Sequence, residues 1–268
     1  MAICVGIGGW TFEPWRGVFY PEGLPHAKEL RHAASVLKTI EINGTFYRTP
    51  SAKSCADWAG QVPDGFVFAL KATRYVTQRR VLAEAEESVG KFISSGIVEM
   101  GDRLGPINWQ FAATKAFDPD DMAAFMALLP KAHEGVALRH ALEVRHPSFV
   151  VPEFVALARK HGVAIVYADH ETYPAIADLT ADFTYARLQQ TREEIETGYG
   201  AEDLARWAKA AKAWEQGAVP EGLPEVGAPA KAKGKKAAKR DVFLYLIAGA
   251  KVRNPAGAVA LQEQVDGG

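Results

Sequence analysis

The feature that most constrains this chain is a series of eight short apolar runs separated by segments of helical periodicity. The runs lie at 2–8, 38–43, 66–71, 104–111, 138–145, 163–169, 182–188 and 241–247. Helical patterns lie near 26–37, 51–60, 82–100, 118–130, 150–161, 201–216 and 254–265. Strands that alternate with helices form parallel sheets. This alternation of eight strands with helices therefore predicts an α/β fold of the TIM-type (β/α) barrel class, a closed parallel sheet with outer helices.

The alternation of side chains within the runs supports a barrel. The third run alternates the bulky Phe66, Phe68 and Leu70 with Val67, Ala69 and Lys71. In a barrel the bulky face packs under the helices, and polar residues of the other face emerge at the C-terminal mouth. An open doubly wound sheet is the alternative, but no Gly-x-Gly-x-x-Gly sequence follows the first run, so a dinucleotide site is not predicted.

The length of 268 residues suits one barrel domain spanning 1–268, interrupted by a Gly-, Pro-, Ala- and Lys-rich insertion at 217–240. We expect this insertion to be a flexible surface loop. Its basic stretch at 231–240 raises nucleic-acid binding as an alternative, but no aromatic residues interleave the charges. Because the formal net charge is only −1, nucleic acid and membrane surfaces are not expected as partners.

The N-terminus and the cysteines predict a cytoplasmic location. The two cysteines, Cys4 and Cys55, form neither a disulfide framework nor a zinc ligand set, which is typical of a reducing compartment. The first residues lack a basic region followed by a signal-like apolar stretch, and no run approaches the roughly 18 apolar residues of a membrane span. We expect a soluble protein that is not exported.

Polar residues at the ends of the runs predict a site at the barrel mouth. They are Glu41, Asn43, Lys71, Gln110, Glu143, Arg145, Asp169 and Arg187. Lys71, Arg145 and Arg187 suit a phosphate or carboxylate, and Glu41, Glu143 and Asp169 suit acid, base or metal-ligand roles. The same carboxylates are of the type that binds Mg²⁺ or Mn²⁺, so a divalent metal is one candidate cofactor. The alternative for the whole set is a salt-bridge network that closes the mouth.

The loop after the first run is unusually aromatic, with Trp10, Trp15 and Tyr20. These rings predict either a wall or lid for a flat or sugar-like ligand, or a hydrophobic plug on the barrel rim. Tyr47 has the same two alternatives, donation of a proton or hydrogen bond and simple packing. His146 alternates to the face opposite Glu143, which makes it a rim residue.

Five ordered motifs resemble those of the DUF72 family, which includes the YecE-like proteins. They are Gly8-Gly9-Trp10 with 15–21, then 41–50, 104–110, 143–149 and 180–188. The resemblance runs from the N-terminus to about Trp207 and implies a TIM-type barrel of uncharacterised function. The motif residues that it carries over are Trp10, Glu41, Asn43, Thr45, Tyr47, Lys71, Gln110, Glu143, Arg145, His146, Asp169 and Arg187.

The chain departs from the family pattern at 245–251, where Tyr-Leu-Ile-Ala-Gly-Ala-Lys replaces an Asn-Asn-Asp-like segment. Against the family pattern, this replacement implies that one polar wall of the pocket is missing or rebuilt in this chain. The leading hypothesis is an enzyme that acts on a small anionic or polyhydroxylated substrate by acid–base or metal-assisted hydrolysis or isomerisation. A non-catalytic metabolite-binding module is the second hypothesis. The sequence leaves the substrate and the oligomeric state open.

Overall fold

The fold is a closed barrel of eight parallel strands, as predicted. The computed structural model describes residues 2–228 and 239–267. The barrel strands are β1 (Ile3–Gly8), β2 (Thr39–Ile42), β3 (Val67–Lys71), β4 (Leu104–Gln110), β7 (His140–Glu143), β8 (Ala164–Asp169), β9 (Phe183–Leu188) and β10 (Asp241–Leu246). They follow one another around the barrel in chain order, and β10 pairs with β1 to close it. This arrangement confirms the TIM-type α/β fold.

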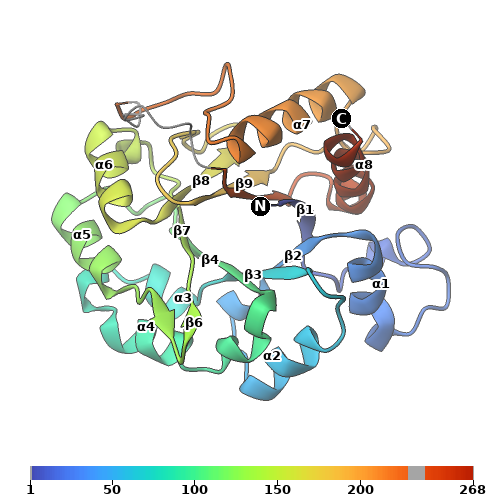
Figure 1. Cartoon of the computed structure of the whole chain (residues 1–268), viewed down its shortest axis with the longest axis horizontal. Helices are drawn as coiled ribbons and strands as arrows, with labels where there is room; N and C mark the ends of the chain where they lie inside the picture. Colours follow the sequence, from blue (N-terminus) through green and yellow to red (C-terminus); the bar gives the residue numbers. More distant parts are fainter. Residues whose placement is uncertain (1, 229–238, 268) are drawn as a thin grey trace.

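Helices surround the barrel (Figure 1). They are α1 (Glu29–Val36), α2 (Ala52–Ala59), α3 (Arg74–Thr77), α4 (Glu86–Ile93), α5 (Pro119–Leu128), α6 (Pro152–His161), α7 (Ala201–Glu215) and α8 (Asn254–Asp266). The single helix expected near 82–100 is instead divided into η4 (Leu82–Glu84), α4 and η5 (Ile97–Arg103). Gly96 separates α4 from η5 with a φ of 99°, and a Cβ there would lie 2.4 Å from the Ala52 backbone. The close approach of this turn to α2 therefore requires glycine.

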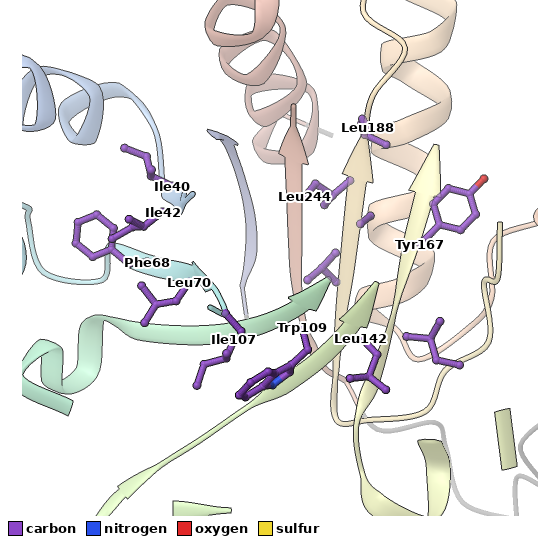
Figure 2. Packing of buried hydrophobic residues seen from close by; sticks show 14 of the residues in the cluster. Ile40, Ile42, Phe68, Leu70, Ile107, Trp109, Leu142, Tyr167, Leu188 and Leu244 are labelled. Atoms are coloured by element: carbon purple, nitrogen blue, oxygen red, sulfur yellow. The ribbon is translucent and has the colours of Figure 1, made fainter. Parts of the chain in front are cut away.

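The two faces of the strands build two separate apolar layers. The inner layer consists of Cys4, Ala69, Ala141, Ala164, Val166, Phe183, Tyr185, Phe243 and Tyr245. The outer layer is bulkier and packs under the helices; Figure 2 shows members of it from Ile40 and Phe68 on one side of the barrel to Tyr167 on the other. The predicted assignment of the bulky face of the third run to the helices is confirmed.

A glycine and a hydroxyl side chain allow close contacts between strands in the barrel interior. Gly6 of β1 lies so close to β2 that a Cβ would be 1.9 Å from the Thr39 carbonyl oxygen. The Thr39 hydroxyl lies 2.8 Å from the Tyr245 hydroxyl and 2.6 Å from the Val67 carbonyl oxygen. These hydrogen bonds satisfy polar groups inside the barrel, where an unpaired group would be costly.

The insertion is packed against the barrel along its first part, 217–228. Asp178, which is buried, accepts hydrogen bonds from the backbone N–H groups of Val226 (2.7 Å) and Gly227 (3.1 Å) and from Arg159 (3.1 Å). Of the insertion at 217–240 that was predicted to be flexible, residues 229–238, which include most of the basic stretch at 231–240, lie outside the described residues. Among the described residues, no helix has the length and apolar character of a bilayer span.

Candidate functional site

A buried ion network crosses the barrel at the mouth. Arg187 of β9 donates from Nη2 to Glu41 Oε1 (3.0 Å) and from Nη1 to Glu143 Oε2 (2.6 Å). Both carboxylates are fully buried, and Arg187 is 4% exposed. The guanidinium therefore joins β2, β7 and β9 across the interior and places one positive charge between two carboxylates that would otherwise repel each other.

Glu143 is the most heavily hydrogen-bonded member of the network. Arg145 donates to its Oε1 from Nε (2.9 Å) and Nη2 (2.7 Å), and Gln110 donates to its Oε2 (2.8 Å). Burial by itself would raise the pKa of Glu143, but Arg187, Arg145 and Gln110 together lower it to about 2. Glu143 is therefore an ionised counter-charge at neutral pH, which argues against its predicted role as a proton donor.

Glu41 is paired with a phenol as well as with Arg187. The Tyr185 hydroxyl donates to Glu41 Oε2. Burial, followed by the charge of Glu41, raises the pKa of Tyr185 well above its ordinary value, so this phenol stays protonated. The Asn108 amide, which lies between the two carboxylates, donates to Glu143 Oε2 at 3.2 Å and lies 3.5 Å from Glu41 Oε2.

A cavity of about 780 Å³ opens beside this network, at the C-terminal ends of β1, β2, β3 and β10. Its walls hold four cationic side chains, Arg48, Lys71, Arg187 and Lys251. No aspartate or glutamate is among the described residues that line it. Trp10 and Trp58 form an aromatic wall, with their ring centroids 5.7 Å apart. Such a site suits an anion that carries a flat or apolar part.

Lys71, unlike Arg145 and Arg187, forms no ion pair in the part of the chain that the structure describes. Its ammonium lies 4.3 Å above the ring centroid of Phe46. Burial, reinforced by the positive charge of Arg187, lowers the pKa of Lys71 to about 8, although Glu41 and Glu143 act in the opposite direction. A lysine with this pKa exchanges a proton readily near neutral pH.

Most of the predicted site residues meet at the mouth, in two groups. Glu41, Gln110, Glu143, Arg145 and Arg187 form the ion network. Trp10, Asn43, Thr45, Tyr47, Lys71 and Arg187 line the cavity. The structure thus contains both a salt-bridge network and a cavity, which the sequence posed as alternatives.

Asp169 and His146 lie apart from these groups. Asp169 accepts hydrogen bonds from Tyr199 (2.6 Å) and Gln190 (2.6 Å). The reason is strand parity: Val166 faces the barrel interior, so Asp169, three residues later, belongs to the outer face. The expected convergence of Asp169 with Glu41 and Glu143 does not occur. His146 is a rim residue that accepts a hydrogen bond from the backbone of Ser148 (3.2 Å), at the start of η6 (Pro147–Phe149).

The predicted carboxylate set for Mg²⁺ or Mn²⁺ is not assembled. Glu41 and Glu143 both bind Arg187, and Asp169 lies elsewhere. Within residues 2–228 and 239–267, no group of three or more His, Cys, Asp and Glu side chains has the geometry of a metal site. The described donor set therefore does not fit this ion.

The residues of the aromatic loop fill both predicted roles, the hydrophobic plug and the wall of the cavity. Trp15 and Tyr20 are buried and form the plug; Trp15 Nε1 donates to the Lys251 carbonyl oxygen (2.9 Å), and the Tyr20 hydroxyl donates to that of Trp10 (2.6 Å). Trp10 itself lines the cavity. The hydrogen bonds of the plug thus hold Lys251 and Trp10 at the cavity wall.

Sequence reasoning missed five residues of the site. They are Arg48, Trp58, Asn108, Tyr185 and Lys251. Asn108 and Tyr185 each precede a predicted site residue by two positions, so strand alternation contained the signal. Arg48, Trp58 and Lys251 lie in a loop, a helix and a 3₁₀-turn, where no such period applies.

The comparisons with known proteins agree with the fold. No curated protein matches the chain significantly. A DUF72 family protein from Thermotoga maritima MSB8 has a similar structure, with a TM-score of 0.71 and 22% identity over 98% of this chain and 97% of that chain. Another, from Enterococcus faecalis V583, has a TM-score of 0.71 and 16% identity over 99% of this chain and 96% of that one. The family model described as "Protein of unknown function DUF72" matches residues 4–267, and the chain belongs to this family.

Proposed function

We propose that this protein is an enzyme that binds a small anionic substrate in the barrel-mouth cavity and acts on it by acid–base chemistry, as in an isomerase or a hydrolase. The observation that carries the proposal is a cavity with four cationic side chains and no aspartate or glutamate among its described lining residues. Active sites of this fold lie at the C-terminal face of the barrel.

The cations of the cavity have different proposed roles. Arg48 and Lys251 lie in segments that follow the ends of β2 and β10 and line the cavity. We assign them to binding of the phosphate or carboxylate of the substrate. Arg187 is anchored by Glu41 and Glu143, so it supplies a fixed positive charge. Lys71 is the proton-transfer group, because its pKa of about 8 lies close to neutral pH. A cytosolic location, supported by the free cysteines, belongs to the same proposal.

Calorimetric titration with inorganic phosphate tests the binding step. We expect the wild type to bind phosphate, and Arg48→Met and Lys251→Met to weaken binding about tenfold each through loss of a charge contact. Lys160→Met is the matched control, because Lys160 is exposed on α6 and does not line the cavity. Equal phosphate affinity in all four proteins would refute the proposed site.

A screen of phosphorylated sugars and sugar acids tests the catalytic step. Turnover of any of them should fall at least about a hundredfold in Lys71→Met if Lys71 transfers the proton. The second candidate is a binding module, which Ile247 and Ala248 favour because they give the cavity an apolar wall where the family resemblance implied polar residues. A ligand that binds tightly without turnover would support that candidate.

A further inference from the structure

We propose that Lys71 is an amine nucleophile that forms an imine with an aldehyde or ketone group of the anionic substrate. This inference rests on the proposed function, narrows the substrate to anionic carbonyl compounds, and extends the role of Lys71 from proton transfer to covalent attack. It comes from the position of the amine: Lys71 lies at the end of β3, lines the cavity, and shares that cavity with Arg187, whose guanidinium is held by Glu41 and Glu143.

The carboxylates next to Lys71 are already engaged. Glu41 accepts hydrogen bonds from Arg187 and Tyr185, and Glu143 accepts them from Arg145, Arg187 and Gln110. The Lys71 amine forms no ion pair among the described residues, and its ammonium lies over the ring of Phe46. A lysine amine in partly apolar surroundings beside other cations is an activated nucleophile.

The backbone of Lys71 is held firmly. Thr45 is buried, and its hydroxyl lies 2.6 Å from the Lys71 carbonyl oxygen and 2.9 Å from the Ile42 carbonyl oxygen. The hydroxyl ties the end of β3 to the loop after β2. The amine is therefore carried by a rigid strand end, as a group that must meet a bound carbonyl carbon requires.

Charge and burial keep a useful fraction of the amine neutral. The pKa of Lys71 is lowered from 10.5 to about 8, first by burial and then by Arg187. At pH 7 about a tenth of such amines are unprotonated, against about one in three thousand at the ordinary pKa. The lower intrinsic nucleophilicity of a weaker base offsets part of this gain, which leaves an advantage on the order of a hundredfold.

The covalent step balances without a further reactant. The Lys71 Nζ lone pair attacks the carbonyl carbon, the C=O π pair moves to oxygen, and a proton passes through solvent from Nζ to that oxygen, which gives the carbinolamine. The carbinolamine oxygen is then protonated and leaves as water while the C=N bond forms. Addition of water reverses both stages and restores the free amine. The resulting iminium withdraws electrons from the neighbouring carbon, which serves isomerisation or carbon–carbon cleavage.

The experiment uses glycolaldehyde phosphate as an anionic aldehyde and glycolaldehyde as a neutral one, each followed by borohydride reduction and peptide mass spectrometry on the full chain. We expect Lys71 to be labelled about a hundredfold faster than Lys160 by both reagents at pH 7. Inorganic phosphate should slow only the labelling by glycolaldehyde phosphate. Lys71→Arg, checked for folding by circular dichroism, should lose the fast label.

The outcomes separate this inference from the proposed function. If phosphate binds but Lys71 is labelled no faster than Lys160, the imine is refuted and the anion site stands; Lys71 is then a cation–π partner of Phe46. If glycolaldehyde labels Lys71 preferentially but phosphate neither binds nor protects, the reactive amine stands and the proposed anion site fails. Fast labelling of Lys71 with phosphate protection supports both.

Discussion

Replacement of Glu143 by glutamine should destabilise the protein in a pH-dependent manner. Glutamine keeps the shape of the side chain but removes the buried charge that Arg145 and Arg187 face. The pKa of Glu143 is lowered from 4.5 to about 2 in the folded chain. At about 1.4 kcal/mol per pKa unit, this shift contributes about 3 kcal/mol to the free energy of unfolding at neutral pH. A cost of this size is usual when one partner of a buried ion pair is removed.

The sign of the pH dependence follows from the lowered pKa. The contribution is complete above the unfolded value of 4.5 and is lost as the pH falls through about 2. The gap between wild type and Glu143→Gln should therefore be about 3 kcal/mol at pH 7 and about 1 kcal/mol at pH 3.

Urea unfolding, followed by circular dichroism at pH 7, 5, 4 and 3, measures this gap. Urea is uncharged and leaves the ion network unscreened, unlike guanidinium chloride. Glu22→Gln is the matched control, because Glu22 is exposed; its gap should be near zero throughout. The reasoning is refuted if the gap for Glu143→Gln is the same at pH 7 and pH 3.

Three further predictions concern other parts of the chain. Asp178→Ala should lower the free energy of unfolding by about 2 kcal/mol, because it removes the acceptor of three hydrogen bonds. Limited proteolysis should then cut the segment 217–228, which Asp178 anchors, faster than in the wild type. Gly6→Ala should prevent folding, because its Cβ would lie 1.9 Å from the Thr39 carbonyl oxygen. Gly90→Ala is the control: it has open space around it in α4 and should raise the melting temperature. A Gly6→Ala protein that is soluble and melts cooperatively would contradict this prediction. Sulfate should bind the wild type more weakly at pH 9 than at pH 7, because Lys71 loses its charge above about pH 8 whereas sulfate does not titrate near neutral pH. Calorimetry should show no such change in sulfate affinity for Lys71→Met.

Strand alternation accounts for the parts of the structure that the sequence predicted well. The period of two placed Glu41 and Lys71 at one end of the barrel, and the network and the cavity both contain residues from that set. The same period, applied consistently, would have removed Asp169: Tyr167, two residues earlier, belongs to the outer apolar layer. It would also have added Tyr185, which precedes Arg187 by two residues and donates to Glu41.

The remaining features depend on contacts that no local period describes. Arg48 and Lys251 lie far apart in the sequence and meet only because β1, β2 and β10 are neighbours in the closed barrel. The break between α4 and η5 depends on the approach of Gly96 to Ala52, a contact made through tertiary packing. The choice between ion network and ligand site was likewise a matter of three-dimensional geometry, since both use the same residue types.

The bridge made by Arg187 has a consequence for the order in which the chain folds. Its two carboxylate partners lie 146 and 44 residues earlier in the sequence. During synthesis, a nascent chain that ends before β9 contains both acids without the guanidinium that bridges them inside the barrel. Loop-closure entropy must also be overcome before such distant contacts form. Productive collapse should therefore wait until β9 has left the ribosome, and fragments truncated before Arg187 should remain open and sensitive to proteases.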